Sequence, residues 1–155
     1  DGYILKSGSK IYDLQNPTSK MSKSSSSVQG ILEIMDAPEV NAKKIKSAVT
    51  DTGREVVFDE KEKPGISNLM TIHSTISGRS IAGIEDDFAG KGYGDFKTEV
   101  AEVVVEFLRP IRQRALEFLA DEAALLAILH TGAAKARIVA QKTVSTTYKN
   151  LGLVQ

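Results

Sequence analysis

Apolar residues recur at three- and four-residue steps over much of the second half of the chain, as is typical of amphipathic helices. The longest such pattern lies between residues 100 and 119 and predicts one long helix. Pro110 lies inside it. Because proline removes a backbone hydrogen bond and crowds the carbonyl of Glu106, a kink is expected there. The predicted apolar stripe consists of Val100, Val103, Val104, Phe107, Leu108, Ile111, Ala115, Phe118 and Leu119.

Two further helices are expected after this one. Asp121 is a good N-cap for a short helix over 122–129, and Gly132 is expected to break the pattern. The last helix is expected over about 133–151. Its charged residues are all cations, with no acid from Gly132 to Gln155, so it is the best candidate for contacts with RNA phosphates. Cations that merely complement the helix dipole are the alternative.

Three shorter helices are expected in the middle of the chain. The first begins with Asp36 as N-cap, Pro38 in the first turn and Glu39 as the third residue of a capping box. The second is expected from Pro64 to a stop at residue 78, and the third, capped by Ser80, follows directly. In the first helix the expected buried side is Val40, Ile45, Ala48 and Val49, and the expected solvated face is Lys43, Lys44 and Lys46.

The polar residues of this middle region are expected to have mainly structural roles. His73 has no evident partner and is expected to have a surface or partly buried structural role. The acids at 85–87 are consecutive and point in different directions on a helix, which favours a solvated acidic turn over a metal site. The glycines of 90–94 predict a tight turn before the long helix; an RNA contact through Lys91, Tyr93 or Lys97 is the alternative.

The N-terminal third lacks helical periodicity. Residues 3–5 predict a brief strand, and 28–35 are an apolar run short enough for another. Between them, 20–27 hold two lysines three residues apart among five serines. Serine favours caps and turns, so a mobile loop is predicted. Two ammonium groups with several hydroxyl and N–H donors suit a polyphosphate; a Ser/Lys-rich linker that binds nothing is the alternative.

Bulk properties narrow the class of protein. The 155 residues suggest one domain, and a formal net charge of zero excludes a global field that would draw the chain to nucleic acid. The lack of cysteine excludes disulfides and thiolate chemistry and fits a cytoplasmic location. No apolar run approaches the roughly 20 residues of a membrane span. No signal-peptide pattern opens the chain, so no membrane partner is expected.

Three landmarks, the first together with the segment that leads into it, give the chain a resemblance to a known family. Residues 20–24 spell Lys-Met-Ser-Lys-Ser, the KMSKS signature of the class I aminoacyl-tRNA synthetases. The approach at 12–19, Tyr-Asp-Leu-Gln-Asn-Pro-Thr-Ser, resembles the tryptophanyl branch of that family. So do Pro-Gly-Ile-Ser-Asn-Leu at 64–69 and Gly-Lys-Gly-Tyr-Gly-Asp-Phe-Lys at 90–97. The landmarks occur in the family's order, and the similarity runs over essentially the whole chain.

The resemblance is to the C-terminal part of such an enzyme. The family's HIGH signature and the bulk of its nucleotide-binding α/β domain are absent. The implied fold is mainly α: an irregular helical bundle preceded by a loop and short strands of a truncated α/β nucleotide-binding domain. On this interpretation, 1–35 are the edge of the catalytic domain and 36–155 form a helical tRNA anticodon-binding domain. An acidic residue often follows KMSKS in the family; here three more serines follow.

The resemblance implies that the full-length enzyme joins tryptophan to its tRNA, with ATP and Mg²⁺, through a tryptophanyl-adenylate. Lys20 and Lys23 are the implied catalytic residues, because the leaving pyrophosphate needs its charge stabilised. Met21, Ser22 and Ser24 complete the implied ATP-binding loop. A cytoplasmic homodimer is implied as well, and no metal ligands are expected in this chain. The candidate tRNA-binding residues are Lys91, Tyr93, Arg109, Arg112, Lys135, Arg137 and Lys142.

Two other interpretations stay open. A helical RNA-binding or protein-docking module without an ATP site would carry the same helices and cations. A purely structural helical scaffold would fit the zero net charge. If ATP protects Lys20 and Lys23 against an acylating reagent, the ligase is favoured. Salt-dependent tRNA binding without any ATP effect would favour the module, and the absence of both would favour the scaffold.

Overall fold

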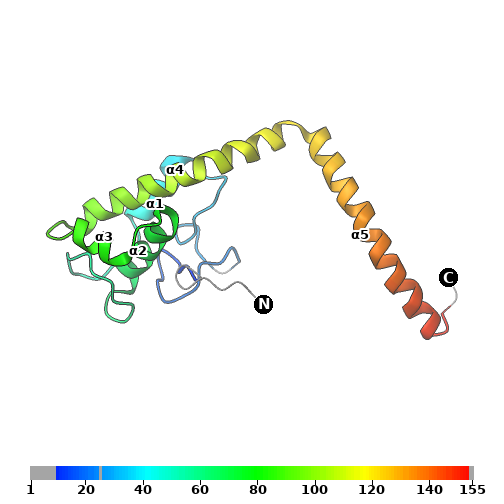
Figure 1. The fold of residues 1–155 in the computed structure, drawn as a ribbon, viewed down its shortest axis with the longest axis horizontal. Coiled ribbons are helices and arrows are strands. Elements are labelled where there is room, and N and C mark those ends of the chain that lie inside the picture. The colour runs from blue at the N-terminus through cyan, green and yellow to red at the C-terminus, as the bar shows by residue number, and fades with distance from the viewer. Residues whose placement is uncertain (1–9, 25, 154–155) are drawn as a thin grey trace. The chain divides into compact units, whose positions relative to one another are not determined.

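The chain folds into five α-helices joined by irregular segments in the computed structural model, which describes residues 10–24 and 26–153 (Figure 1). Among these residues the strand-like structure is one isolated antiparallel bridge between Tyr12 and Lys20. The predicted mainly α fold is therefore confirmed. The helices are α1 (Pro38–Lys46), α2 (Pro64–Ser77), α3 (Ile81–Asp87), α4 (Tyr93–Ala120) and α5 (Glu122–Asn150).

The chain divides into two compact units, Asp1–Arg112 (unit 1) and Gln113–Gln155 (unit 2). The boundary between them falls inside α4. This division reflects compactness alone. The functional division after residue 35, which the family resemblance implies, stays a prediction.

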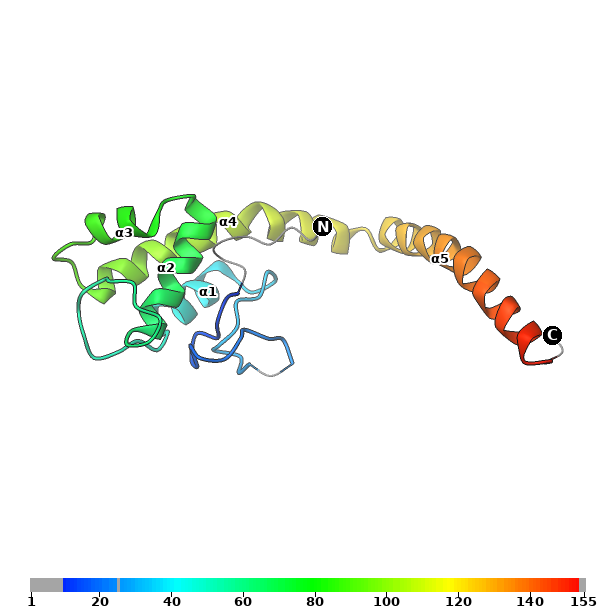
Figure 2. The ribbon, with the colours of Figure 1, turned by 60° about the horizontal axis from the view of Figure 1, so that its bottom comes forward.

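Unit 1 contains the hydrophobic core. Helices α1, α2 and α3 lie beside the first half of α4 in two views (Figures 1 and 2). Phe88, just after α3, packs edge-on against Phe96 of α4, with ring centroids 4.9 Å apart. Leu14 and Val56 bring two irregular segments into the same core. The buried apolar residues are Leu14, Ile45, Ala48, Val56, Ile66, Leu69, Met70, Ile72, Ile84, Phe88, Phe96, Val100, Ala101 and Val104.

Helix ends in unit 1 follow the sequence signals with one exception. Gly78 ends α2 in the left-handed region, at φ 74°, where glycine has no steric penalty. The Ser80 hydroxyl caps α3 as predicted. Before α1, however, Ala37 occupies the N-cap position and no side chain caps the helix, so the prediction that Asp36 caps it is wrong. The Asp36 carboxylate instead pairs with Lys44 Nζ at 2.5 Å.

The buried side of α1 also differs from the prediction. The sequence pattern places Lys44 on the solvated face, yet its side chain is only 2% exposed. Its Nζ donates to the Ile31 carbonyl at 2.9 Å as well as to Asp36, and these two acceptors satisfy the buried charge. Val40 and Val49, predicted to be buried, are 43% and 45% exposed. The apolar pattern fails here because a paired lysine fills the position of a core residue.

Residues 28–35 form turns and irregular backbone, so the strand predicted there is wrong. Two of their carbonyls bind side chains of α1 instead of a neighbouring strand. Besides the Lys44 bond to Ile31, the Asn41 amide donates to the Glu33 carbonyl at 2.8 Å. The irregular path is thus fixed by α1, which sequence periodicity cannot reveal. The strand predicted at 3–5 lies outside the described residues.

Helix α4 runs through Pro110 without interruption, as one long helix was predicted to do. The kink at this proline stays a prediction. The apolar stripe is buried only in the first half of the helix. Val100 and Val104 are 0% and 2% exposed, whereas Phe107 and Leu119 are 50% and 59% exposed.

Helix α5 is continuous where two helices were predicted. Asp121 caps it as expected, accepting the Ala124 N–H at 3.0 Å. Gly132 lies within the helix, so the predicted break is wrong. One glycine in an exposed helix costs about 1 kcal/mol relative to alanine, which flanking alanines and leucines can outweigh. None of the described α5 residues is buried.

By length and composition α5 is apolar enough to cross a membrane. It is the one helix of this kind in the part of the chain that the structure describes. Lys135 and Arg137 interrupt its apolar sequence. A single helix of this kind is weak evidence for a membrane protein.

Candidate functional site

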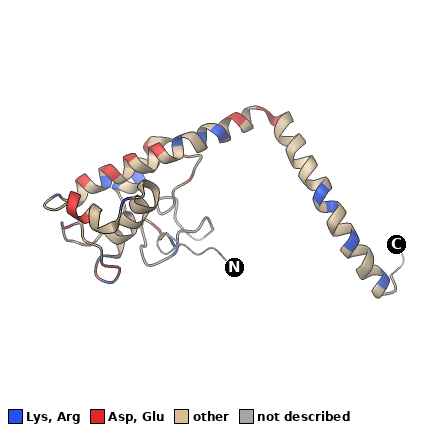
Figure 3. Ribbon diagram, viewed as in Figure 1, with Lys and Arg blue, Asp and Glu red and all other residues tan. Residues whose placement is uncertain are grey.

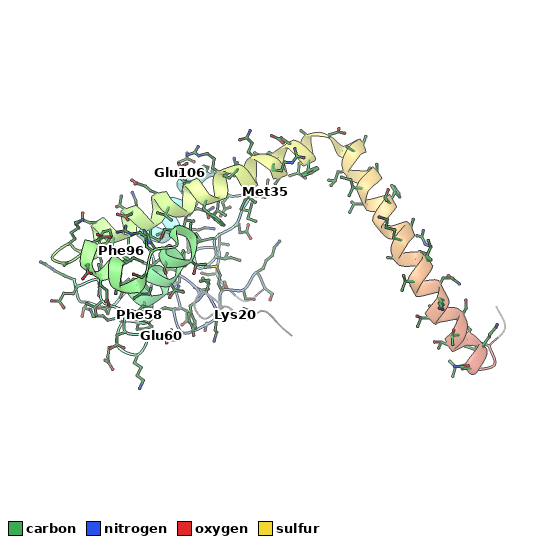
Figure 4. All side chains as sticks on the ribbon, in the orientation of Figure 1. Lys20, Met35, Phe58, Glu60, Phe96 and Glu106 are labelled. Atoms are coloured by element: carbon green, nitrogen blue, oxygen red, sulfur yellow. The ribbon has the colours of Figure 1, made fainter. Side chains whose placement is uncertain are left out.

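The 20–27 loop starts from a fixed base. Tyr12 and Lys20 form the antiparallel bridge, and the Met21 N–H donates to the Ile11 carbonyl at 3.0 Å. The Met21 side chain packs against the core. Figure 4 shows Lys20 among the irregular segments that precede α1. The loop therefore leaves a defined part of unit 1 instead of hanging from a free linker.

Hydrogen bonds at the loop tip join Ser22 to Ser26 and do not involve the side chains of the two lysines. The Ser26 N–H donates to the Ser22 carbonyl at 2.9 Å, and the Ser22 N–H donates to the Ser26 hydroxyl at 3.0 Å. The Ser22 and Ser24 hydroxyls are 3.3 Å apart. Lys20 and Lys23 are exposed, and neither forms an ion pair within residues 10–24 and 26–153. Their charges are available to a ligand.

A buried carboxylate lies beneath this turn. Asp13 is 5% exposed, and its Oδ1 accepts the backbone N–H groups of Gln15 at 2.7 Å and Asn16 at 3.0 Å. Burial raises the pKa of this carboxyl, but hydrogen bonds from the Ser26 hydroxyl and the two backbone N–H groups outweigh it and leave the pKa below 3.8. Asp13 is therefore ionised at neutral pH.

A cavity of about 240 Å³ opens beside the loop. Lys20 and Asp13 are both among its lining residues, whereas Lys23 is not. The structure thus brings one of the two predicted catalytic lysines to this cavity. Its lining residues are Asp13, Gln15, Asn16, Ser19, Lys20, Ser26 and Ser27.

Tyr93, a candidate tRNA contact, uses its hydroxyl inside unit 1. The hydroxyl accepts from Lys63 Nζ at 2.9 Å and donates to the Asp51 carboxylate at 2.8 Å. Burial raises the pKa of Tyr93, with Lys63 opposing and Asp51 reinforcing the rise. The hydrogen bond that Lys63 donates to the Tyr93 hydroxyl is the main cause of a raised pKa at Lys63. The Tyr93 hydroxyl, the Lys63 ammonium and the Asp51 carboxylate are hydrogen-bonded to one another and join the starts of α2 and α4.

The other basic candidates of unit 1 differ in how far their charge is occupied. Lys91 is exposed in the turn before α4 and forms no ion pair in the described residues; its Nζ lies 4.8 Å from the centre of the Phe88 ring. Arg109 pairs with Glu106 of the same helix at 2.5 Å. Arg112 donates from Nε to the Met35 carbonyl at 3.4 Å. Lys91 is the most available of the three for a phosphate.

In unit 2, the cations of α5 lie from its middle to its end. Figure 3 shows blue segments there and red at the start of the helix. Lys135 and Lys142 are seven residues apart, as are Lys142 and Lys149, which places all three on one face. Arg137 is rotated by about 200° from Lys135 and lies on another face. The structure groups the lysines and separates the arginine.

The sequence matches a known protein family over residues 4–109, and the family is described as tRNA synthetases class I (W and Y). The chain belongs to this family. It is 49% identical over 152 residues to tryptophan–tRNA ligase 2 of Streptomyces avermitilis and 53% identical over 152 residues to tryptophan–tRNA ligase of Leifsonia xyli subsp. xyli. Each alignment covers 98% of this chain and 45% of the relative, so the chain spans less than half their length.

Solved structures of tryptophanyl-tRNA synthetases have the same fold. The enzyme from Mycoplasma pneumoniae superposes with a TM-score of 0.76 at 29% identity, over 95% of this chain and 46% of that one. The Campylobacter jejuni enzyme, complexed with ADP and tryptophan, superposes with a TM-score of 0.70 at 28% identity, over 93% of this chain and 44% of that one. The resemblance drawn from the three sequence landmarks is confirmed.

Membership in this family does not account for the polar groups that fix the segments around the 20–27 loop. Sequence reasoning missed the roles of Asp13, Lys44 and Asp51. Asp13 had a usable signal: in Asp-Leu-Gln-Asn-Pro an aspartate precedes a turn, where its carboxylate commonly accepts nearby backbone N–H groups. Lys44 and Asp51 had none, because their partners lie 8 and 42 residues away.

Proposed function

We propose that this chain is the C-terminal part of a tryptophan–tRNA ligase and that its 20–27 loop binds the phosphates of ATP. One observation carries the proposal: Lys20 and Lys23 are exposed without ion pairs in the described residues, on a loop whose base is fixed in the core. Membership in the class I tRNA synthetases supports it. Residues 1–35 then belong to the catalytic domain, and 36–155 form the anticodon-binding domain.

The proposed chemistry is adenylate formation. The tryptophan carboxylate attacks the α-phosphorus of ATP, the bond to the bridging oxygen breaks, and pyrophosphate leaves with the negative charge. Lys23 stabilises most of this charge and Lys20 assists, because a fixed cation acts where charge develops. Met21, Ser22 and Ser24 hold the loop's shape. The tryptophan pocket and the other wall of the ATP site belong to parts of the enzyme outside this chain.

Magnesium would arrive bound to the ATP phosphates. Among the described residues no group of three His, Cys, Asp or Glu side chains could hold a metal ion, so the proposal assigns no magnesium ligand here. The helices after residue 36 would contact the tryptophan tRNA, with Lys91 and the α5 lysines as the available cations. The full-length enzyme would be a cytoplasmic homodimer.

Substitution of the loop lysines in the full-length protein tests the proposal. Lys23→Ala is expected to lower ATP–pyrophosphate exchange by about 10²–10³-fold, the effect of removing one transition-state donor. Lys20→Ala is expected to have a smaller effect. Lys46→Ala, which removes an exposed lysine from α1, is the matched control and should leave exchange unchanged. Normal exchange by Lys23→Ala, or adenylate formation by the isolated 155-residue chain, would overturn the proposal.

A second candidate is an RNA-binding module without an ATP site, which the lysine face of α5 favours. Its test is acylation of Lys20 and Lys23 in the full-length protein with and without ATP. Protection by ATP supports the ligase. Salt-dependent tRNA binding with no protection by ATP supports the module.

A further inference from the structure

Asp13 fills the space where residue 30 would carry a side chain. Gly30 is buried, and a Cβ atom added there would lie within 3.0 Å of the Asp13 carboxylate, a separation that real Cβ atoms essentially never show. The backbone of Gly30 does not have a positive φ. Glycine is therefore required at residue 30 for space rather than for backbone conformation.

The Asp13 carboxylate cannot easily move aside. The Gln15 and Asn16 N–H groups hold its Oδ1. The segments that carry the two residues are also tied together, since the Leu14 N–H donates to the Gly30 carbonyl at 3.0 Å. A side chain at residue 30 must therefore break one of these interactions.

The same carboxylate is connected to the middle of the KMSKS loop. Ser26 lines the same cavity as Asp13, and its hydroxyl helps to lower the pKa of that carboxyl. The Ser26 oxygen also accepts the Ser22 backbone N–H at 3.0 Å. Ser22 lies between Lys20 and Lys23. Ser26 thus lies between a buried anion at the loop's base and the backbone that carries both lysines.

We propose that Asp13 and Gly30 form one coupled unit, the Asp13–Gly30 clasp, which acts through Ser26 to position the KMSKS loop. Asp13 is a positioning residue and does not contact the phosphates. The clasp fixes Ser22 and Ser26, so that Lys20 and Lys23 leave the loop in set directions. Its consequence for ATP rests on the proposed function; the coupling between the two residues does not.

A double-mutant cycle in the full-length protein tests the coupling. Gly30→Ala is expected to lower pyrophosphate exchange by about 10-fold or more, because its Cβ displaces the carboxylate. Asp13→Ala alone should lower it by a similar factor because the Ser26 hydroxyl then has no carboxylate to bind. The double variant should be no worse than Gly30→Ala, since the new methyl group then has room. Multiplication of the two single-variant effects in the double variant would overturn the clasp.

Hydrogen exchange of the backbone amides in 20–27 provides a readout that does not depend on activity. Asp13→Ala and Ser26→Ala should both speed exchange of these amides by about 10-fold or more, while the amides of α2 stay unchanged. This measurement also keeps the proposal testable if Gly30→Ala fails to fold. Unchanged exchange of the 20–27 amides in both variants would contradict it.

Asp59 is the matched control, because its carboxylate makes the same kind of turn. Its Oδ1 accepts the N–H groups two and three residues ahead, from Lys61 at 2.9 Å and Glu62 at 3.0 Å. Asp59→Ala should leave both the 20–27 amides and pyrophosphate exchange unchanged. If the loop lysines prove dispensable for exchange, the ATP role fails, yet faster amide exchange in Asp13→Ala would still establish the clasp.

Discussion

Lysines in two regions of unit 1 have opposite surroundings. In the 20–27 loop, Lys20 and Lys23 are exposed and unpaired within the described residues. Around α1 and α2, Lys44 and Lys63 pair with carboxylates and bind backbone carbonyls. A charge that a protein carboxylate already neutralises cannot also neutralise a ligand's phosphates. The partners of a lysine, and not its spacing in the sequence, therefore separate a binding role from a structural one.

The largest effect should come from breaking the buried pair. Asp36→Ala is expected to lower the free energy of unfolding by about 3 kcal/mol, since it leaves the Lys44 charge buried with only the Ile31 carbonyl. Lys44→Met should cost less, because it removes the charge and leaves a carboxylate that is 25% exposed. Lys23→Ala should change stability by under about 0.5 kcal/mol.

Urea denaturation of the three variants gives these free energies. The comparison between the two regions fails if Asp36→Ala is as stable as the native protein. It also fails if Lys23→Ala is as destabilised as Asp36→Ala, because the loop lysine would then have a structural role.

The next effect should come from the Tyr93 hydroxyl. Tyr93→Phe is expected to destabilise by about 1.5–3 kcal/mol, the usual contribution of hydrogen bonds to charged groups, because Lys63 and Asp51 are both deprived of a partner. Tyr148→Phe on α5, at a ring that is 40% exposed, is the control and should be nearly neutral. Thermal unfolding measures both. If Tyr93→Phe lowers the affinity for tRNA without loss of stability, the Tyr93 hydroxyl contacts the RNA and does not hold the fold.

Local patterns predicted those parts of the fold that depend on local interactions. The Ser80 cap, the Gly78 stop and the long α4 are all confirmed, since each is decided by residues within a few positions. The predicted strand over 28–35 was wrong because side chains of α1 bind its carbonyls. The predicted break at Gly132 was wrong because one glycine does not outweigh its helix-forming neighbours.

For the candidate site, the sequence supplied the KMSKS residues through family resemblance, whose family is confirmed. It did not supply what holds the loop. Asp13 contacts Gln15 and Asn16 locally, but its approach to Gly30 joins residues 17 positions apart across a turn. Neither composition nor periodicity reveals such an approach, because it depends on which segments the core brings together.

Acid should reduce the stability that the Asp13 and Asp51 carboxylates contribute in the two regions, and it should do so in the same pH range. The pKa values of Asp13 and Asp51 are both lowered from 3.8: burial opposes the lowering, and hydrogen bonds cause it, joined at Asp51 by the Lys63 charge. A carboxyl with a depressed pKa stabilises the fold above its unfolded-state pKa, and this contribution is lost as pH falls through the folded value. The difference in stability between native protein and Asp13→Asn should therefore be constant above about pH 5 and shrink below about pH 3.8.

Salt should affect the contributions of Asp51 and Asp13 to stability differently. The Asp51→Asn difference should decrease in 1 M salt, where the Debye length is about 3 Å, because a Lys63 charge contributes to it. The Asp13→Asn difference should change little, since hydrogen bonds from neutral groups lower its pKa. Urea titrations at about pH 3, 5 and 7 with and without salt measure these differences. A strong salt dependence at Asp13 would mean that a loop lysine pairs with it, and Lys20 would then not be available to ATP.

The smallest effect is expected from the lysines of α5. Like the loop lysines they are exposed, but they lie on the surface of a helix. Replacing Lys135, Lys142 and Lys149 with Gln should weaken tRNA binding by the full-length protein. It should also reduce the slope of log affinity against log salt by about one for each phosphate that is no longer neutralised. Arg137→Gln, which removes a cation from a different face, is the control and should leave the slope unchanged. Equal reductions from Arg137 and the lysines would mean that the helix attracts RNA through its total charge. A change confined to the lysine face would mean that the helix presents one side to the phosphate backbone.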